Sequence, residues 1–496
     1  MIHPGTSILA LLLAGLTSPV LAQEPVSPSA QAAVASEAAQ LRAATVLPII
    51  SALEPKLGKM SRDVWSLAEI GFKETKSSAL LQQELKAAGF RVTPGVDGMP
   101  TAFIAEAGSG GPVIALLAEY DALPGIAQAA VPYESPVEGK NVGHACGHNL
   151  LGAASVTAAI AVKQWLQKNG VSGTIRLYGT PAEEGGFSKV YLARDGFFKD
   201  VDLTLTWHPA DRNNATPSRF LAMISGKFRF QGVASHAAAA PERGRSALDG
   251  VEVMDVATNF MREHIPQEAR IHYVITKGGG QPNIVPANAE SFYYVRHYDT
   301  AVVKDIWERV VKAAEGAALA TGTKVDVEIV SGTYGTLPNY KLNGIVQRNL
   351  ERVGGYAYSP EEAAFARQIL GTYPNLGIKE SNPSQIDPMG PERKDSGSSD
   401  VGDVSWVTPT ATLFTASFVR GTMPHSWQAA AASGTPIGEK GALVAAKTMA
   451  LTAAELFLSP AEITAAKAEF HERRGPDFKY VSLIGDRKPA LDYTDH

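Results

Sequence analysis

GHACGHN at residues 143–149 places the only cysteine of the 496-residue chain between two histidines, His144 and His148. The stretch is a glycine-flanked turn that runs into an Ala-rich segment, residues 150–168, with the composition of a helix. A thiolate at Cys146 would be stabilised by the N-terminus of that helix and by a bound cation. A lone cysteine is more often an inert buried side chain, so assigning it as a metal ligand depends on residues further along the chain.

TPAEEGG at residues 180–186 supplies two adjacent glutamates in a Gly/Pro turn, directly after a predicted strand over residues 173–179. Adjacent residues cannot easily bind one cation together. The natural division is one ligand and one general base that acts on water. We expect Glu184 to be the ligand and Glu183 the base. A solvated charge pair is the alternative interpretation.

Two more histidines follow predicted strands. His208 comes directly after the strand 201–207, and His425 comes after the strand 410–418 and a short Gly/Pro loop. Each alone is more often structural. Together with the cysteine and the carboxylates they make the mixed sulfur, nitrogen and oxygen set that borderline divalent metals bind. Asp121, at another strand end, either starts a turn or orients a histidine ligand from behind.

Strands and helices alternate over most of the chain, which predicts an α/β fold with a parallel or mixed sheet. The chemical residues stand just past strand ends, where open α/β sheets hold their ligands. An Ala/Ser/Pro-rich linker is expected over residues 23–40, and a Pro/Gly/Ser-rich surface excursion over residues 360–402. The other predicted elements are helices over 40–88 and 439–458 and strands over 89–92, 101–105 and 112–119.

Residues 220–335 show a different order of predicted strands and helices from the rest of the chain. Their order βαββαβ is typical of a ferredoxin-like split unit, with strands over 228–233, 271–276, 291–296 and 324–330 and helices over 244–260 and 302–320. Metal-type residues occur on both sides of this segment. We therefore expect a catalytic domain in two parts, residues 23–219 and 336–496, interrupted by an inserted domain.

Composition excludes some classes of protein. The net charge of −5 and the lack of a basic run make nucleic acid an unexpected partner, and one cysteine excludes an intrachain disulfide framework. The apolar run 7–16 and the small residues before Gln23 are typical of a signal peptide over residues 1–22, cleaved after Ala22, although Lys and Arg are missing from its start. This predicts a periplasmic or secreted protein with no membrane span after processing. An uncleaved anchor is the alternative.

Together these motifs resemble the M20 metallopeptidase family, most closely its amidohydrolase branch, which has His-x-Cys-Gly-His where other branches have a His-x-Asp motif. Three further stretches resemble the aminobenzoyl-glutamate hydrolase subgroup of the B-subunit type: GHNLLG at 147–152, SDVGDVSW at 399–406 and FHER at 470–473. One departure is Asn149, where many relatives have Asp.

The resemblance implies a two-metal catalytic domain with an inserted lid domain that also dimerises, and hence a homodimer or higher homo-oligomer. Two divalent ions per subunit are implied, Mn or Zn, with Co possible on the same ligands. Cys146 would bridge the two ions, Glu183 would be the base, and the remaining ligands would be His148, Glu184, His208 and His425. In the lid, His236 would stabilise an oxyanion, often across a dimer interface, and Asn283 and Arg296 would bind substrate.

The expected function is metal-dependent hydrolysis of the amide bond of an N-acyl amino acid such as aminobenzoyl-glutamate, or of a related small dipeptide-like substrate. The alternatives are a metal-dependent dipeptidase, an ester-active amidase, a non-catalytic binding subunit on the same fold, and an oxidoreductase or zinc-stabilised structural protein. A binding subunit would be favoured by loss of the base or of a ligand, and none is lost. A structural zinc site would have no reason to keep a spare Glu183.

Overall fold

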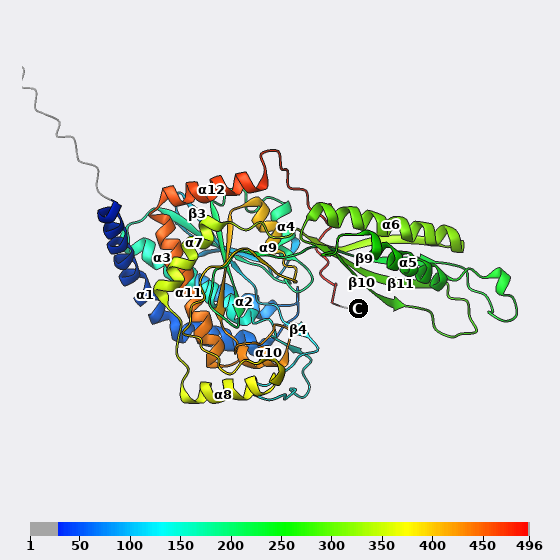
Figure 1. The fold of residues 1–496 in the computed structure, drawn as a ribbon, viewed down its shortest axis with the longest axis horizontal. Helices are drawn as coiled ribbons and strands as arrows, with labels where there is room; N and C mark the ends of the chain where they lie inside the picture. The colour runs from blue at the N-terminus through cyan, green and yellow to red at the C-terminus, as the bar shows by residue number, and fades with distance from the viewer. Residues whose placement is uncertain (1–27, 495–496) are drawn as a thin grey trace, which may run out of the picture. The chain divides into compact units, whose positions relative to one another are not determined.

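The computed structural model describes residues 28–494 (Figure 1). Backbone contacts divide the chain after Leu41 into two units, and both large sheets and the metal-type residues belong to the second. The predicted signal peptide, residues 1–22, lies outside the described residues. The predicted linker over 23–40 is wrong from Pro28 onward, because α1 spans Pro28–Leu67. The alanines of this stretch have the highest helix propensity of any residue, which explains the helix.

A six-stranded mixed sheet forms the centre of the fold (Figure 1). The prediction of a parallel or mixed sheet is confirmed, because β1, β3, β6, β7 and β14 run in one direction while β2 is antiparallel to its neighbours β1 and β6. In sheet order the strands are β1 (Arg91–Pro94), β2 (Phe103–Ser109), β6 (Gly173–Gly179), β3 (Val113–Ala118), β7 (Leu203–Ala210) and β14 (Thr410–Ala416).

Both faces of this sheet are covered by helices. Strand β3 shows why: Ile114 and Leu116 point into one hydrophobic cluster, whereas Ala115 and Leu117 point into another. Successive side chains of a strand point to opposite faces, so a continuous apolar strand requires a layer on each side. The first cluster includes α3 (His148–Asn169), α7 (Tyr340–Val353), α11 (Pro436–Phe457) and α12 (Pro460–Arg474), and the second includes α4 (Ser188–Arg194) and α9 (Val401–Val407).

The helix predicted over 40–88 is interrupted, because α1 ends at Leu67 and α2 spans Thr75–Ala87. Ala68 and Phe72 adopt left-handed backbone conformations in the break, at φ 43° and 60°. The Glu69 carboxylate then accepts the backbone N–H of Ser77 at 2.8 Å in the first turn of α2. This break brings Phe72 into the second hydrophobic cluster.

A separate four-stranded sheet follows the predicted order βαββαβ. Its elements are β9 (Ala222–Gln231), α5 (Ala247–Met261), β10 (Arg270–Lys277), β11 (Asn288–His297), α6 (Thr300–Thr321) and β12 (Lys324–Thr333). The strands lie in the order β10-β11-β9-β12 and every pair is antiparallel. The sheet has its own core, in which Phe228 packs against Tyr293 and Trp307.

The predicted excursion over 360–402 contains a helix, α8 (Pro360–Gly371), begun by a capping box between Ser359 and Glu362. Past α12, residues 475–494 form no helix or strand. The short elements are β4 (Leu123–Pro124), β5 (Val142–Gly143), β8 (Ser218–Arg219), β13 (Arg393–Lys394), α10 (Trp427–Ser433), η1 (Val96–Gly98), η2 (Pro241–Arg243), η3 (Arg262–His264) and η4 (Pro374–Leu376). Among the described residues no single helix is long and apolar enough to cross a membrane, and only α11 with α12, bent by 101°, passes as a pair.

Candidate metal centre

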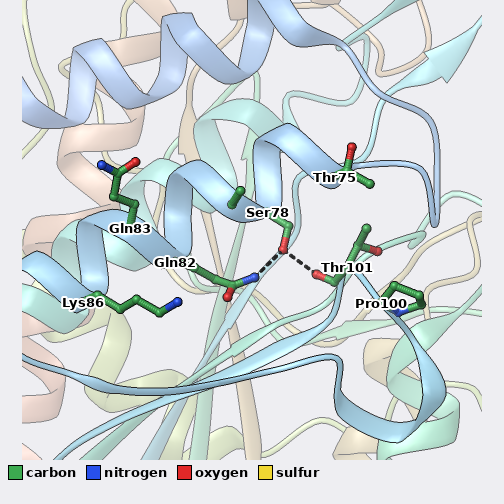
Figure 2. A pocket seen from close by; sticks show the side chains of 8 residues that line it. Thr75, Ser78, Gln82, Gln83, Lys86, Pro100 and Thr101 are labelled. Carbon is green, nitrogen blue, oxygen red and sulfur yellow. Dashed lines mark hydrogen bonds between the residues drawn. The ribbon is translucent and has the colours of Figure 1, made fainter.

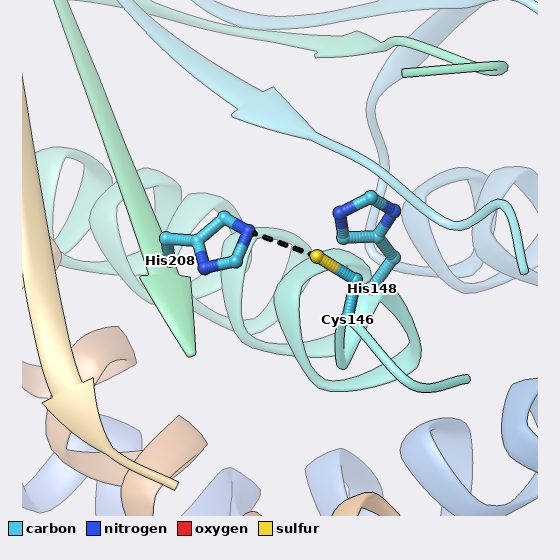
Figure 3. Close-up of side chains that lie close together, drawn as sticks. All are labelled: Cys146, His148 and His208. Carbon is cyan, nitrogen blue, oxygen red and sulfur yellow. Dashed lines mark hydrogen bonds between the residues drawn. The ribbon is translucent and has the colours of Figure 1, made fainter. Parts of the chain in front are cut away.

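Cys146 and His148 lie where the chain enters α3, and His208 faces them from β7 (Figure 3). The Cys146 Sγ is 3.4 Å from Nε2 of His208. Gly147 between the first two residues has φ 80°, and a Cβ there would lie 2.9 Å from the Pro209 side chain. Only glycine therefore allows the turn to approach β7 so closely.

His208 does not follow its strand, as the sequence predicted, but lies inside it, because β7 continues to Ala210. The reason is the neighbouring strand: β14 pairs with β7 along its whole length, with Phe414 opposite His208 and Ala416 opposite Ala210. A partner strand of this length extends the ladder beyond the apolar run that the sequence displays.

Five predicted ligands gather into two groups that share one sulfur. Cys146, His148 and His208 form the first, and Cys146, Glu184 and His425 the second, with the ligand atoms of each group within 4.8 Å of one another. His425 reaches the centre through a left-handed backbone at φ 62°, and its N–H donates to the Ala145 carbonyl at 2.8 Å. The shared sulfur suits a thiolate that bridges two cations.

Two unsatisfied atoms show that these residues fit divalent metal ions. Nε2 of His148 and Oε1 of Glu184 are buried and have no hydrogen-bond partner within residues 28–494. Buried polar atoms are nearly always paired, so two such atoms at one centre indicate a missing ligand. The other ring nitrogen of His148, Nδ1, lies 2.9 Å from Oδ1 of Asp121. Since a carboxylate only accepts, Nδ1 carries a proton, and with a cation bound Nε2 would offer its lone pair to that cation.

The electrostatics of the centre also favour cations. Burial and the neighbouring Glu184 raise the pKa of the Cys146 thiol well above its usual value. Burial together with the charges of Glu119 and Glu184 raises the pKa of Glu183. Burial and the neighbouring His148 lower the pKa of His208, which keeps that ring neutral as a ligand must be. A divalent cation reverses the pKa shifts of the thiol and the carboxyl, because its charge stabilises both anions.

The turn that carries Glu183 and Glu184 is strained at both ends. Ala182 and Phe187 have positive φ values of 56° and 54°, which cost side chains other than glycine free energy. The carboxylate of Glu184 lies 3.2 Å from Nε2 of His425, and its backbone N–H donates to Asp121 at 2.9 Å. The Glu183 carboxylate is 3.9 Å from Nε2 of His148. The two glutamates therefore face different histidines of the same centre.

Sequence reasoning missed a buried chain of charges behind the centre. Oε2 of Glu119 lies 3.3 Å from Nε2 of His148, and Glu119, His148 and Glu183 form a third potential ligand group. The ammonium of Lys189 lies 2.9 Å from Glu119 and 2.6 Å from Asp400, and all three side chains are buried. Because Lys189 already neutralises Glu119, we assign Glu119 to the charge balance of the site. The alternation of Glu119 and Asp121 past the end of β3 was a signal that could have identified it.

Two polar residues of the GHACGHN stretch point elsewhere. Nε2 of His144 lies 3.1 Å from the Val64 carbonyl, and burial lowers the pKa of this ring to about 4. The amide of Asn149 donates to the backbone of Ser61 at 3.2 Å and of Ser433 at 3.0 Å. Asn149 therefore ties α3 to α1 and α10 and does not contact the metal centre.

The three predicted residues of the inserted segment are not part of this cluster. His236 is exposed, and its Nδ1 accepts the backbone N–H groups of Ala238 and Ala239. Asn283 is also exposed and lies nearby, since its carbonyl accepts the N–H of Ala237 at 2.9 Å. Arg296 on β11 lies over the Tyr294 ring, with a buried Nε that has no partner among residues 28–494. Over the same residues, no hydrogen bond or ion pair links these three side chains to the metal ligands.

A cavity of about 310 Å³ lies away from the ligands, between α2 and the turn before β2 (Figure 2). Two of its polar side chains are already paired, because Gln82 donates to the Ser78 hydroxyl at 3.0 Å and Ser78 donates to the Thr101 carbonyl at 2.7 Å. It holds none of the predicted site residues and is lined by Thr75, Ser78, Ala79, Gln82, Gln83, Lys86, Pro100 and Thr101.

The sequence model of peptidase family M20/M25/M40 matches residues 115–371, which contain four of the five clustered ligands. The chain belongs to this family. The M20 chain is 43% identical over 423 residues to the B subunit of p-aminobenzoyl-glutamate hydrolase from Escherichia coli (strain K12), covering 80% of this chain and 88% of that protein. The predicted family and subgroup resemblance is confirmed.

A mammalian relative supports the same assignment, and a solved structure shares the fold. The Xaa-Arg dipeptidase of Mus musculus is 30% identical over 465 residues, which cover 90% of this chain and 96% of that protein. A dinuclear metal-binding peptidase of the M20 family from Bacillus subtilis shares the fold with a TM-score of 0.55 and 19% identity, covering 82% of this chain and 99% of that one. The M20 chain is a metal-dependent hydrolase of amide bonds.

Proposed function

We propose that this M20 hydrolase cleaves the amide bond of N-acyl amino acids of the aminobenzoyl-glutamate type, using two divalent ions held on Cys146. One observation carries the proposal: two ligand groups share the Cys146 sulfur, beside a carboxylate, Glu183, that belongs to neither group. The identity of 43% to a p-aminobenzoyl-glutamate hydrolase polypeptide supports the substrate class.

The ligands have separate positions in this proposal. His148 and His208 would hold one ion with Cys146, while Glu184 and His425 would hold the other. When bound, the ions supply positive charge that lowers the pKa of a water molecule and polarises the substrate carbonyl. Manganese and zinc are the metals that we propose, and cobalt suits the same ligands. Asp121 fixes His148 through Nδ1 and Glu184 through its backbone N–H.

Glu183 is the group that moves the proton. Its carboxylate accepts a proton from the attacking water and later delivers it to the nitrogen of the leaving amine. His148 is fully buried whereas the His425 side chain is 55% exposed. Substrate would therefore reach the centre from the His425 side.

The four-stranded segment is proposed as an inserted lid and dimerisation domain over residues 220–335, within a catalytic domain made of residues 23–219 and 336–496. Its βαββαβ order and its separate core support a ferredoxin-like domain. His236 would stabilise the oxyanion, while Asn283 and Arg296 would bind the substrate carboxylate. Within residues 28–494 the buried Nε of Arg296 has no partner, which supports this role, since a guanidinium pairs well with a carboxylate. The lid must close, or a neighbouring copy of the chain must supply these residues, for catalysis to occur.

The remaining expectations stay proposals. We propose a homodimer or higher homo-oligomer that is periplasmic or secreted after cleavage behind Ala22, with a small-molecule substrate and no nucleic acid. The names of the relatives leave a second type of partner to test, because the A subunit of the Escherichia coli hydrolase is also similar, at 25% identity. Size determination of the purified chain, alone and with an A-type polypeptide, distinguishes the two assemblies.

A release assay tests the proposed activity. The metal-depleted protein, and the protein restored with Mn²⁺ or Zn²⁺, are given p-aminobenzoyl-glutamate, p-aminobenzoyl-glutamine and Xaa-Arg dipeptides. We expect metal-dependent release of p-aminobenzoate from the glutamate compound, and slower release from the glutamine compound, whose side chain lacks the second carboxylate. Equal rates with and without metal would contradict the proposal. Faster cleavage of the dipeptides would support the second candidate, a dipeptidase, which the 30% identity to Xaa-Arg dipeptidase favours.

A further inference from the structure

The last described residues of the chain contact the hydrophobic cores beside both sheets and end next to the turn that carries Glu183 and Glu184. The Tyr480 hydroxyl donates to Asp403 at 2.6 Å, and the Val481 carbonyl accepts the Tyr334 hydroxyl at 2.8 Å. Leu483 belongs to the core of the four-stranded sheet and Ile484 to the second cluster beside the six-stranded sheet. We call residues 475–494 the C-terminal strap.

Two arginines fasten the strap further on. The guanidinium of Arg194, at the end of α4, donates to the carbonyls of Gly485 at 3.1 Å and Arg487 at 2.6 Å. The guanidinium of Arg487 itself lies 2.9 Å from Glu328 on β12. The strap is therefore held at several points before it reaches its final residues.

Near the end of the strap, the Tyr493 side chain occupies a slot beside two glycines, Gly71 and Gly185. A Cβ at Gly185 would lie 2.8 Å from Cε2 of Tyr493, and a Cβ at Gly71 would overlap the Tyr493 hydroxyl oxygen. The Phe72 ring meets the Tyr493 ring edge to face, with 5.9 Å between centroids. Since any side chain at either glycine would displace the ring, the slot exists only because both positions are glycine.

The slot lies on the strained turn that carries Glu183 and Glu184. Gly185 follows Glu184 directly, and a Cβ at the next residue, Gly186, would lie 2.5 Å from the Phe72 ring. The two left-handed residues of the turn, Ala182 and Phe187, cost free energy that surrounding packing must offset. Tyr493 and Phe72 supply that packing from outside the turn.

The surroundings of the phenol agree with this position. Burial raises the pKa of Tyr493 above its usual value, and the charges of Asp121, Glu74, Glu184 and Glu183 raise it further.

We propose that Tyr493 is a positioning residue: its ring, delivered by the C-terminal strap, holds the 182–187 turn so that Glu184 meets the metal and Glu183 meets the water. The proposal rests on the roles proposed above for these two glutamates. It assigns no proton transfer to the tyrosine hydroxyl. The expected consequence is that loss of the ring lowers turnover and metal affinity together, while substrate binding elsewhere in the site changes less.

The experiment compares Tyr493→Ala, Tyr493→Phe and the neighbouring exposed Asp492→Ala as a matched control. We expect kcat to fall about tenfold to a hundredfold for Tyr493→Ala, the range that small misplacement of catalytic groups causes. KM should change less than kcat. Affinity for Mn²⁺, measured by competition with a chelator, should fall as well. Tyr493→Phe should restore parental kcat and metal affinity, and Asp492→Ala should behave as the parent.

A double-mutant cycle gives a second test that does not depend on the hydroxyl. The three heavy atoms nearest to a Cβ at Gly185 all belong to the Tyr493 ring, and the φ of Gly185 is open to alanine. Gly185→Ala should therefore displace the ring and lower kcat, and the pair Gly185→Ala with Tyr493→Ala should be no worse than Tyr493→Ala alone. Additive losses would overturn the proposal.

The outcomes separate this inference from the proposed function. If Tyr493→Ala keeps parental kcat and metal affinity, or lowers only the melting temperature, the ring does not position the turn. If Tyr493→Phe is as impaired as Tyr493→Ala, the hydroxyl and not the ring is responsible, and the positioning proposal fails. If the parent cleaves none of the amide substrates, the proposed function fails, whereas the metal-affinity comparison still decides whether Tyr493 holds the turn.

Discussion

Asp121 and His148 are joined by a contact of 2.9 Å between Oδ1 of the aspartate and Nδ1 of the histidine, and both side chains are buried. The second oxygen of Asp121 accepts the backbone N–H of Glu184, also at 2.9 Å. One carboxylate thus orients a ligand at the start of α3 and a ligand in the 182–187 turn. In the proposed two-metal centre each of these residues belongs to a different group around Cys146, so Asp121 would set the spacing of the two groups.

Asp121→Asn should weaken metal binding by about 10- to 100-fold, as loss of a hydrogen-bond partner behind a ligand typically does. The amide nitrogen of asparagine cannot accept, so either His148 or the Glu184 N–H loses its partner. Elemental analysis after dialysis against a chelator measures the effect. Asp200→Asn, at an exposed carboxylate paired with Arg176, is the control. Equal metal content in Asp121→Asn and the parent would contradict the assignment.

Glu183→Gln and Glu184→Gln should differ, although the residues are neighbours. Loss of the base at Glu183 should lower kcat by about 10²- to 10⁴-fold with the metal retained. Loss of the ligand at Glu184 should lower metal content and activity together. Turnover measured alongside metal stoichiometry distinguishes the two. A Glu183→Gln variant that is active with metal bound would remove Glu183 as the base.

Lys189→Met should destabilise the protein by about 3–5 kcal/mol, because it leaves Glu119 and Asp400 as buried carboxylates without their cation. Adding Asp400→Asn should recover part of the loss, since one buried charge is then removed. Denaturant unfolding measures both variants. Lys467→Met, at a half-exposed pair with Asp202, should cost about 1 kcal/mol or less. A small effect of Lys189→Met would show that these charges are not coupled.

Asp97→Asn should stabilise the protein at high pH and not at low pH. Burial and the neighbouring Asp195 raise the pKa of Asp97 from 3.8 to about 7. The folded protein keeps this proton in a pH range where the unfolded chain has lost it, so the carboxyl makes folding less favourable as the pH rises from about 4 to about 7. Asparagine also tolerates the left-handed φ of 56° at this position.

The gain for Asp97→Asn is modest because Asp97 is partly exposed and solvent screens its charge. We expect a melting temperature about 1–2 °C higher at pH 8 and a much smaller difference at pH 4. Thermal unfolding at the two pH values checks this. A gain of the same size at both would show that backbone conformation, and not ionisation, is responsible.

Mixed dimers test whether His236 acts across an interface. His236→Ala and Glu183→Gln should each be inactive alone. If the lid serves the neighbouring copy of the chain, a mixed dimer contains one centre with both residues intact and regains part of the activity. No recovery, with exchange demonstrated by differently tagged chains, would place lid and metals in the same chain.

Much of the fold could be predicted from the sequence because its signals are local. The βαββαβ order followed from short apolar runs, and each of those strands and helices is present. The errors have the same origin. The sequence predicts that the strand ends before His208, but pairing with β14, a strand far along the chain, extends it to Ala210. The sequence predicts one continuous helix over 40–88, because nothing in the sequence indicates the left-handed conformations of Ala68 and Phe72.

By itself the sequence determined which side chains we propose as ligands, and the structure brings five of them together. Cys146 and His148 are two residues apart at a helix start, and Glu183 and Glu184 are adjacent, so their chemistry is visible over a few residues. Tertiary structure alone decided what surrounds them: the charge chain from Glu119 through Lys189 to Asp400, and Tyr493 against Gly185. These contacts join residues that lie far apart along the chain. Patterns of periodicity and spacing carry no information over such separations, because only the packed core brings the residues together.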